Sequence, residues 1–157
     1  MLNILTYPNE KLKQTSIEVT PAEMKDWSLQ IFIDEMIETM KQAKGIGLAA
    51  PQVGKNIRII IATKDDGEIY ALINPEIIKK SFSKVKSEEG CLSIPGKIGI
   101  VKRYKTIEVK ALDRLGKEIK IKANGLFSIV LQHEIDHLDG VLFIDKAERI
   151  FETKDIL

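Results

Sequence analysis

This chain contains few residues that can bind a metal ion through nitrogen or sulfur: two histidines and one cysteine. His133 and His137 stand four positions apart with Glu134 after the first, which is an H-E-x-x-H motif. On a helix, such positions share one face with Cβ atoms about 5–6 Å apart, so two imidazoles can bind one ion. The adjacent glutamate can then act as a base. The pattern predicts a hydrolytic metal site; the alternative is an accidental motif whose histidines fill a core or cap a helix.

A hydrolytic metal site also needs a third protein ligand and one open position for water. In most peptidases with this motif the third ligand lies downstream, but here no histidine follows His137, and Glu148 is only eleven residues further on. Cys91 lies 42 residues upstream of His133, next to Gly90, where the backbone can approach a metal closely. A free cysteine is more often a small apolar residue of the core. We nevertheless expect Cys91 to be the third ligand.

The composition is that of a globular protein with one domain, expected to span residues 1–157: 44% of residues are hydrophobic and 30% are charged. The net charge of +1 does not favour specific binding to nucleic acid or to an anionic membrane. A single cysteine excludes an internal disulfide, and no segment reads as a signal peptide or as a membrane span of about 20 apolar residues. We therefore expect a cytoplasmic protein, in which a metal-binding thiol stays reduced.

The first half of the chain predicts one helix followed by a β-hairpin. Thr20 and Glu23 can form a capping box around Pro21, and apolar residues at helical spacing continue to about Lys44. The glycine-containing segment 45–52 is expected to be a loop. Strands are expected at 57–62 and 69–73, with a turn at 65–67 and an end at Asn74-Pro75.

The second half of the chain predicts two more strands and a second helix. Residues 89–96 form another glycine-containing segment, and residues 104–111 and 117–123 alternate between apolar and polar, as antiparallel strands with one solvent-exposed side do. From Leu126 the apolar spacing becomes helical and continues to about Gly140, so both histidines lie on the apolar side of a helix. The order of elements predicts the α+β class.

Three blocks of the sequence resemble the peptide deformylase family. Residues 45–52 (GIGLAAPQ) are similar to its G-x-G-L-A-A-P-Q block, residues 89–93 (EGCLS) to its E-G-C-L-S block, and residues 132–140 (QHEIDHLDG) to its Q-H-E-x-D-H-L-x-G block. Their order and spacing also agree, and the resemblance extends from the N-terminus to about Phe143. It implies mostly antiparallel β-sheets packed around a central C-terminal helix that carries H-E-x-x-H, plus an N-terminal helix.

The resemblance implies an enzyme that removes the formyl group from the N-terminal formylmethionine of new proteins. It implies Cys91, His133 and His137 as ligands of one divalent metal, with Fe²⁺ expected in the cell and Zn²⁺, Ni²⁺ or Co²⁺ as alternatives. Its partners would be N-formylmethionyl peptides and nascent chains near the ribosome, and we expect a monomer. The Cys-Leu-Ser sequence and the chain length favour a bacterial-type or phage-encoded enzyme.

The resemblance also assigns catalytic roles. A metal-bound water becomes a nucleophile near neutral pH, and Glu134 would take its proton and deliver it to the leaving amine. The side-chain amide of Gln52 and the backbone N–H of Leu92 would stabilise the oxyanion, where losing one donor typically costs about 10²–10³ in rate. Without the family, Gln52 would be interpreted as a loop residue that caps a backbone group.

The resemblance implies a pocket for the methionine side chain, lined by four apolar residues. Leu126, Ile129 and Val130 share a helix face with His133, and the fourth is Ile46; each could equally be an ordinary core residue. The peptide would bind as an added strand along the glycine-containing segments, with Gly47 at that edge.

Two charged residues near the ligands are expected to support them. Asp136 is predicted to pair with a basic group such as Arg103, and Glu89 to orient the loop that carries Cys91. After Gly140 the segment 143–157 is expected to form a short helix at most.

Two other functions are alternatives for this motif. One is a zinc endopeptidase, which would require a downstream third ligand. The other is a non-catalytic module that binds metal or peptide, in which Glu134 would be structural.

Overall fold

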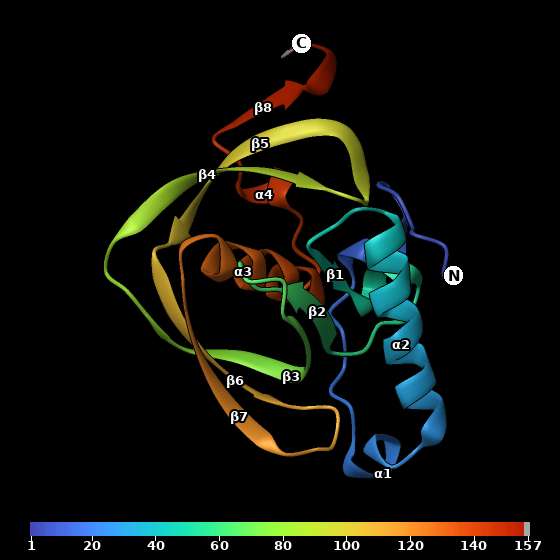
Figure 1. Ribbon diagram of the computed structural model, residues 1–157. Helices are drawn as coiled ribbons and strands as arrows, with labels where there is room; N and C mark the ends of the chain where they lie inside the picture. Colours follow the sequence, from blue (N-terminus) through green and yellow to red (C-terminus); the bar gives the residue numbers. More distant parts are fainter. Residues whose placement is uncertain (156–157) are drawn as a thin grey trace.

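The computed structural model describes residues 1–155, with one helix, α3, at its centre (Figure 1). The helices are α1 (Pro21–Met24), α2 (Trp27–Gln42), α3 (Gly125–Leu138) and α4 (Phe143–Lys146), with 3₁₀ turns η1 (Glu10–Lys13), η2 (Ala50–Val53) and η3 (Thr153–Asp155). The strands are β1 (Gly47–Ala49), β2 (Ile59–Thr63), β3 (Ile69–Lys80), β4 (Lys84–Cys91), β5 (Ile94–Tyr104), β6 (Thr106–Leu112), β7 (Glu118–Asn124) and β8 (Arg149–Glu152).

Two antiparallel sheets lie on either side of α3. The larger sheet has the strand order β1-β2-β3-β6-β7, and the smaller has the order β4-β5-β8. In Figure 1 the smaller sheet lies above α3, strands β3, β6 and β7 lie below it, and α2 lies beside β1 and β2. The predicted fold class, antiparallel sheets around a C-terminal helix with an N-terminal helix, is confirmed.

Strand β2 connects the two main hydrophobic clusters. Ile60 and Ala62 are buried in the cluster that includes α3, whereas Ile59 and Ile61 are buried in the cluster that includes α2. Successive strand residues point to opposite faces, so a strand covered on both sides is apolar at every position. This burial fixes β2, and with it the neighbouring β1, against the helix that carries both histidines.

Polar contacts fix α3 against the smaller sheet. The Gln132 side chain accepts a hydrogen bond from the Tyr104 backbone N–H (2.9 Å) and donates one to the Tyr104 carbonyl (2.9 Å). Ser128 also donates to that carbonyl, at 3.2 Å. Because Tyr104 ends β5, these bonds set the position of α3 along the smaller sheet.

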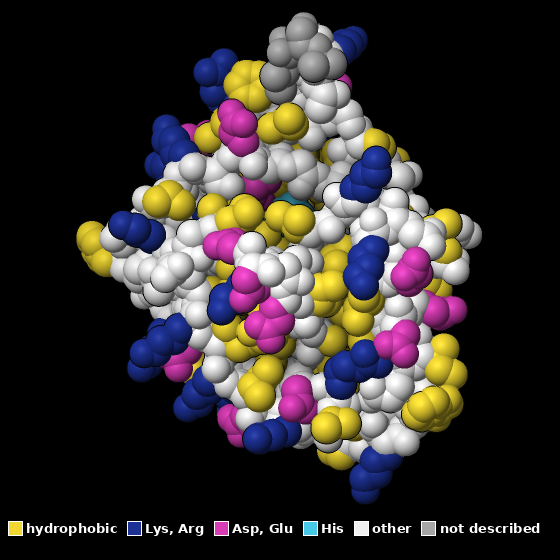
Figure 2. Space-filling view, viewed as in Figure 1, with side chains coloured by type: hydrophobic (Ala, Val, Ile, Leu, Met, Phe, Trp, Pro, Cys, Tyr) yellow, Lys and Arg dark blue, Asp and Glu magenta, His cyan; other side chains and the backbone are white. Residues whose placement is uncertain are grey.

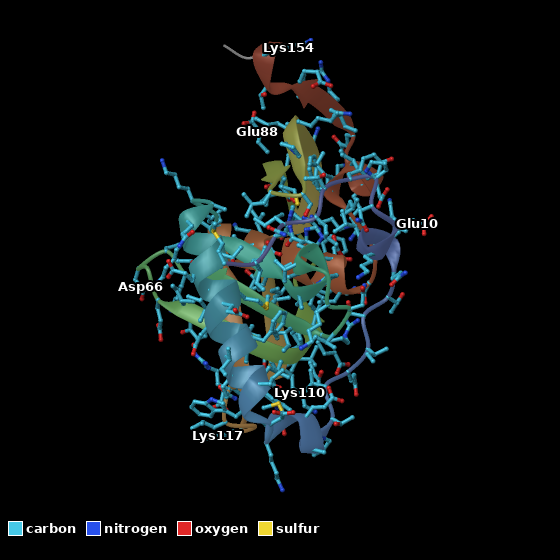
Figure 3. The ribbon with its side chains drawn as sticks, turned by 90° about the vertical axis from the view of Figure 1, so that its right-hand side faces the viewer. Glu10, Asp66, Glu88, Lys110, Lys117 and Lys154 are labelled. Carbon is cyan, nitrogen blue, oxygen red and sulfur yellow. The ribbon has the colours of Figure 1, made fainter. Side chains whose placement is uncertain are left out.

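Surface charges mark the turns between strands. In Figure 3, Asp66 lies in the turn between β2 and β3 and Lys117 lies between β6 and β7, both at the periphery of the molecule. No helix among residues 1–155 is long and apolar enough to cross a membrane.

The predicted N-terminal helix is divided in two. The Thr20 hydroxyl accepts the Glu23 backbone N–H at 3.2 Å, as expected for the cap, but α1 ends at Met24. Asp26 then caps a new helix by accepting the Ser28 N–H at 2.9 Å. Helix α2 ends at Gln42, before the predicted end, and Lys44 adopts a left-handed backbone conformation (φ 58°).

Two expectations for the first half were wrong. Segment 45–52 is not a loop: Gly47–Ala49 pairs with β2, and a 3₁₀ turn follows. Strand β3 does not end at Asn74-Pro75 but continues to Lys80 through an irregularity in its pairing with β6. Asn74 takes a positive φ of 52° there, and its side chain bonds the Val19 backbone, so the pairing is interrupted at Asn74-Pro75 but the strand does not end.

Three strands besides β1 were not predicted. Residues 84–104 form the long hairpin of β4 and β5, closed by the two residues Leu92 and Ser93. After α4 the chain does not stop at a short helix, because β8 pairs with β5. The predicted strands at 57–62, 104–111 and 117–123 and the helix from Leu126 are present within a few residues, and the strand predicted at 69–73 is the first part of β3.

Candidate metal centre and active site

The three predicted ligands come together between the smaller sheet and α3. Cys91 is the last residue of β4, and His133 and His137 lie on consecutive turns of α3. One potential ligand atom from each of the three residues lies within 4.8 Å of the others, and Cys91 Sγ is 3.4 Å from His137 Nε2. No other group of three His, Cys, Asp or Glu side chains with this spacing occurs among residues 1–155.

The donor set fits one divalent metal ion. With metal–sulfur and metal–nitrogen bonds of about 2.3 and 2.1 Å, the ligand atoms of a tetrahedral site lie about 3.5 Å apart. The observed 3.4 Å between Cys91 Sγ and His137 Nε2 agrees with this spacing. Three protein ligands leave a fourth position open, which is typical of a catalytic rather than a structural site.

The two histidines have different electrostatic surroundings. Burial, together with the nearby charges of His133 and Arg103, lowers the pKa of His137 well below its usual value, so this imidazole is neutral. Burial would also lower the pKa of His133, but hydrogen bonds to Cys91 and Glu89 raise it to about 10. The surroundings of His133 therefore favour a positive charge, whether a proton or a metal ion supplies it.

Glu89 connects His133 to a buried ion-pair network. Glu89 Oε1 lies 2.8 Å from His133 Nδ1 and accepts from Arg103 Nη2 at 2.8 Å, while Oε2 accepts from Arg103 Nε at 2.8 Å. Burial alone would raise the pKa of Glu89, but the bonds from Arg103 and His133 lower it to about 2. Glu89 is therefore an anion that contacts the predicted ligand His133 directly, rather than only the loop that carries Cys91.

The predicted pair of Asp136 with Arg103 is confirmed. Arg103 Nη1 lies 2.6 Å from Asp136 Oδ2, and Lys146 Nζ lies 3.1 Å from Asp136 Oδ1. The Arg103 side chain is only 2% exposed. The carboxylates of Glu89 and Asp136 compensate its buried charge. Asp136 thus acts on the network and not on a metal ligand directly.

Glu134 lies beside the predicted ligand His133, and one of its carboxylate oxygens is unpaired. Among the described residues, Glu134 Oε2 is buried and has no hydrogen-bond partner. Burial raises the pKa of Glu134 to about 7. Its carboxyl group lies against Gly47, where an added Cβ would come within 2.9 Å of Glu134 Cγ and Cδ. An unpaired oxygen here can bind a water molecule or a polar substrate group.

Gln52 caps a backbone group, as expected for a loop residue, and also places its amide next to Cys91. Its Oε1 accepts the Ala49 N–H at 2.8 Å, which is the backbone cap that the sequence suggested without the family. Its Nε2 donates to Ser93 Oγ at 3.1 Å and lies 3.5 Å from Cys91 Sγ. The amide is therefore held at both ends, with its donor side next to the proposed ligand sulfur.

A pocket of about 500 Å³ opens beside these residues. Figure 2 shows it as a hollow with a histidine at its base and hydrophobic side chains around it. It is lined by all five residues predicted to bind substrate, Ile46, Gly47, Leu126, Ile129 and Val130, and also by Cys91, Leu92, Gln52, His133 and Glu134. His137 is not in its lining, although the sequence placed it in the same site.

The lining residues differ in exposure. Ile46 and Leu126 are about half exposed (48% and 54%), which is unusual for large apolar side chains and places them at the rim. Val130 is buried. Gly47 lies on β1, the edge strand of the larger sheet, so one side of its backbone is not paired within that sheet.

Sequence reasoning missed three contributors to the site. Ser93 accepts the Gln52 amide, and Gln132 fixes α3 to β5. Both lie inside the matching blocks, which could have indicated them. Phe143 stacks against the His133 ring, with centroids 6.2 Å apart. No sequence signal pointed to this contact.

Residues 1–152 match the family model described as Polypeptide deformylase. A peptide deformylase from Halothermothrix orenii is 48% identical over 153 residues, which cover 97% of this chain and 97% of that protein. A second one, from Thermodesulfovibrio yellowstonii, is 50% identical over 150 residues, covering 93% and 88%.

Solved structures agree with these sequence matches. The class I type b peptide deformylase from Acinetobacter baumannii superposes with a TM-score of 0.91 at 34% identity, covering 93% of this chain and 99% of that one. A peptide deformylase from Synechococcus elongatus in complex with actinonin has a TM-score of 0.88 at 38% identity, covering 94% and 79%.

Proposed function

Because this chain belongs to the polypeptide deformylase family, we propose that its reaction takes place in the pocket beside Cys91, His133 and His137. The chain is a metal-dependent hydrolase that removes the N-formyl group from the N-terminal formylmethionine of new proteins and releases formate. The observation that carries the residue assignment is the convergence of a Cys-His-His donor set and an unpaired carboxylate, Glu134, in one pocket.

Cys91, His133 and His137 would hold the metal. The neutral state of His137 supports this role because it leaves one ring nitrogen with a free lone pair. The contact of His133 Nδ1 with Glu89 supports it because it leaves Nε2 available for the metal. When bound, the metal supplies Lewis acidity and lowers the pKa of a coordinated water. We propose Fe²⁺ as the ion in the cell, with Zn²⁺, Ni²⁺ and Co²⁺ as substitutes.

Glu134 would act as the base and then as the acid. Its Oε2 is buried and unpaired among the described residues, so it can accept a proton from water without first breaking a bond within the protein. The pKa of about 7 suits a group that both accepts and returns a proton near neutral pH. Glu134 would return the proton to the methionine nitrogen as the C–N bond to the formyl carbon breaks.

Gln52 and Leu92 would stabilise the oxyanion that forms on the formyl oxygen. The Gln52 amide is fixed by Ala49 and Ser93, so its donor direction is set before the substrate binds. Leu92 follows Cys91 in the turn between β4 and β5, where its backbone N–H would be the second donor.

The apolar part of the pocket would hold the methionine side chain. Ile129 and Val130 lie deeper than Ile46 and Leu126, so the first two would contact the side chain and the second two would close over it. The peptide backbone would pair with β1 at Gly47 and extend that sheet by one strand. Backbone pairing accepts many sequences after the methionine.

The remaining assignments concern the setting of the enzyme. We propose that residues 1–157 form one catalytic domain that acts as a monomer in the cytoplasm. Its substrates are N-formylmethionyl peptides, and we propose nascent chains close to the ribosome as their source. Specific nucleic-acid binding is not part of this proposal.

The test is formate release by protein purified without oxygen and loaded with Fe²⁺, Zn²⁺, Ni²⁺ or Co²⁺ in turn. A formyl-Met tripeptide should yield one formate per peptide with no internal cleavage. Internal cleavage would instead support the zinc endopeptidase. If no metal form released formate, the proposed site would be wrong. Cys91→Ser, His133→Ala and His137→Ala should each lose metal and activity together.

A further inference from the structure

A line of alternating charges runs from the surface of the molecule to one proposed metal ligand. It begins at Lys146 on α4, passes through Asp136 on α3 and Arg103 on β5, and reaches Glu89 on β4. The Lys146 side chain is 46% exposed and that of Asp136 15%, whereas Arg103 and Glu89 are buried, at 2% and 5%. The line ends at His133 Nδ1, 2.8 Å from Glu89.

Each residue in this line is held in place by its hydrogen bonds to the neighbouring residues of the line. Arg103 uses Nε and Nη2 on Glu89, and its Nη1 is bonded to Asp136. A guanidinium is always charged, so a buried Arg103 without Asp136 would keep one uncompensated donor. Asp136 in turn uses its second oxygen for Lys146. Fixing both carboxylates therefore fixes the plane of the guanidinium.

Glu89 connects the fixed guanidinium of Arg103 to the imidazole of His133. Oε1 of Glu89 accepts from Arg103 and also contacts His133 Nδ1, so its position determines the orientation of that ring. The ring then donates through Nδ1 and keeps its Nε2 lone pair for a metal. The His137 ring has no equivalent support: among the described residues its Nδ1 is buried without a partner. The hydrogen bonds of the charge network therefore reach only one of the two imidazoles, that of His133.

Helix α4 also contacts the same imidazole directly. The Phe143 ring is stacked on His133 at an interplanar angle of 23°. Strand β5 leaves space for this ring only because residue 99 is glycine, since a Cβ there would come within 2.9 Å of Phe143. One four-residue helix thus supports His133 both by packing and, through Lys146, by charge.

We propose that Lys146 and Asp136 are positioning residues for the metal site, which act on His133 through Arg103 and Glu89. The inference rests on the proposed ligand role of His133 and extends the site to the helix after the H-E-x-x-H motif. Lys146 touches neither the pocket lining nor a proposed ligand. Its replacement should nevertheless weaken retention of the metal.

The test measures how fast the Co²⁺-loaded protein loses its metal to excess EDTA, followed by the absorption of the cobalt–thiolate bond. Glu89→Gln should speed the loss about 10- to 100-fold. Lys146→Met should speed it about two- to fivefold, the range for a half-exposed ion pair, and Lys146→Arg should restore the original rate. Lys110→Met is the control, because the Lys110 side chain is as exposed as that of Lys146 and pairs with a carboxylate, Glu118, at the far end of the larger sheet.

A double-mutant cycle decides whether the effect passes through Glu89. In the Glu89→Gln protein, Lys146→Met should cause no further change in the rate. The same effect in both backgrounds, or a Lys146→Met rate equal to that of Lys110→Met, would overturn the proposal. Cys91→Ser separates the two proposals: if metal analysis finds that it keeps cobalt as well as the unmodified protein does, the ligand set itself is wrong. Both lysine variants lie at the surface, so neither should prevent folding.

Discussion

Gly47 and Glu134 lie so close together that residue 47 has no room for a side chain. A Cβ built on Gly47 would come within 2.9 Å of Cγ and Cδ of Glu134 and closer still to Oε1. Gly47 lies on β1 and Glu134 on α3, so the edge strand and the central helix meet at the proposed catalytic carboxylate. The glycine therefore fixes where the carboxyl group can lie, in addition to leaving the strand edge open for a peptide.

The first prediction is that Gly47→Ala lowers kcat by about 100-fold, because displacing a catalytic group by about 1 Å costs that much. The metal content should not change, since Gly47 contacts none of the three ligands in the arrangement described. The variant should also unfold at lower urea. In a Glu134→Ala background this stability loss should disappear, because the side chain that clashes is gone. An unchanged kcat would show that Glu134 can shift without consequence.

The second prediction concerns Glu134 itself. Glu134→Gln keeps the size of the side chain but removes the proton acceptor, so kcat should fall by about 10²–10⁴. Metal analysis should still find one equivalent per chain. Glu10→Gln, at the surface (Figure 3), is the control and should behave like the unmodified protein. Full activity of Glu134→Gln would favour a structural role for Glu134 over a catalytic one.

The convergence of the three proposed ligands could be predicted from sequence because their residue types are so scarce. Two histidines at helical spacing and one cysteine left almost no other combination. The hairpin that carries Cys91 could not be predicted in the same way. In β4 the inward positions are Val85, Ser87, Glu89 and Cys91, so polar residues occupy the places where a strand pattern needs apolar ones. These polar side chains face the site. The alternation of apolar and polar residues that identifies a strand in a sequence is therefore missing from β4.

Tertiary contacts explain the other differences between prediction and structure. Residues 47–49 are a strand because β2 pairs with them, whereas their own glycine content favours a loop. Strand β8 is mostly exposed and has no alternation, so only its pairing with β5 defines it. The charge network is partly predictable from sequence. The charges of Asp136 and Arg103 predict their ion pair, but the ion pair of Lys146 with Asp136 is seen only in the structure.

The third prediction separates the two roles of Gln52. Gln52→Leu removes the amide donor and should lower kcat by about 10²–10³, the usual loss for one oxyanion donor. Ser93→Ala removes only the partner that orients this amide, at 3.1 Å, so its kcat should fall much less. Steady-state kinetics on a formyl-Met peptide measure both. Equal losses in the two variants would mean that Gln52 acts only through the structure of the loop.

The fourth prediction concerns stability rather than catalysis. Gln132→Leu keeps the volume of a buried side chain but removes both hydrogen bonds between Gln132 and the Tyr104 backbone. The free energy of unfolding should fall by about 1–3 kcal/mol, as measured by urea denaturation. Gln42→Leu is the control, because Gln42 bonds only to Glu38 on the exposed side of α2, and it should change stability by less than about 0.5 kcal/mol. Similar losses for both would show that Gln132 does not fix α3 to β5.

The fifth prediction tests iron as the working metal. A thiolate beside Fe²⁺ is open to oxidation, and Cys91 is partly exposed in the pocket that the substrate enters. Iron-loaded protein should therefore lose activity faster in air than under argon, whereas nickel- or zinc-loaded protein should lose it at equal rates. Mass analysis of the inactivated protein should find oxygen added to Cys91, the single cysteine of the chain. Equal half-lives of the iron form in air and under argon would count against iron in the cell.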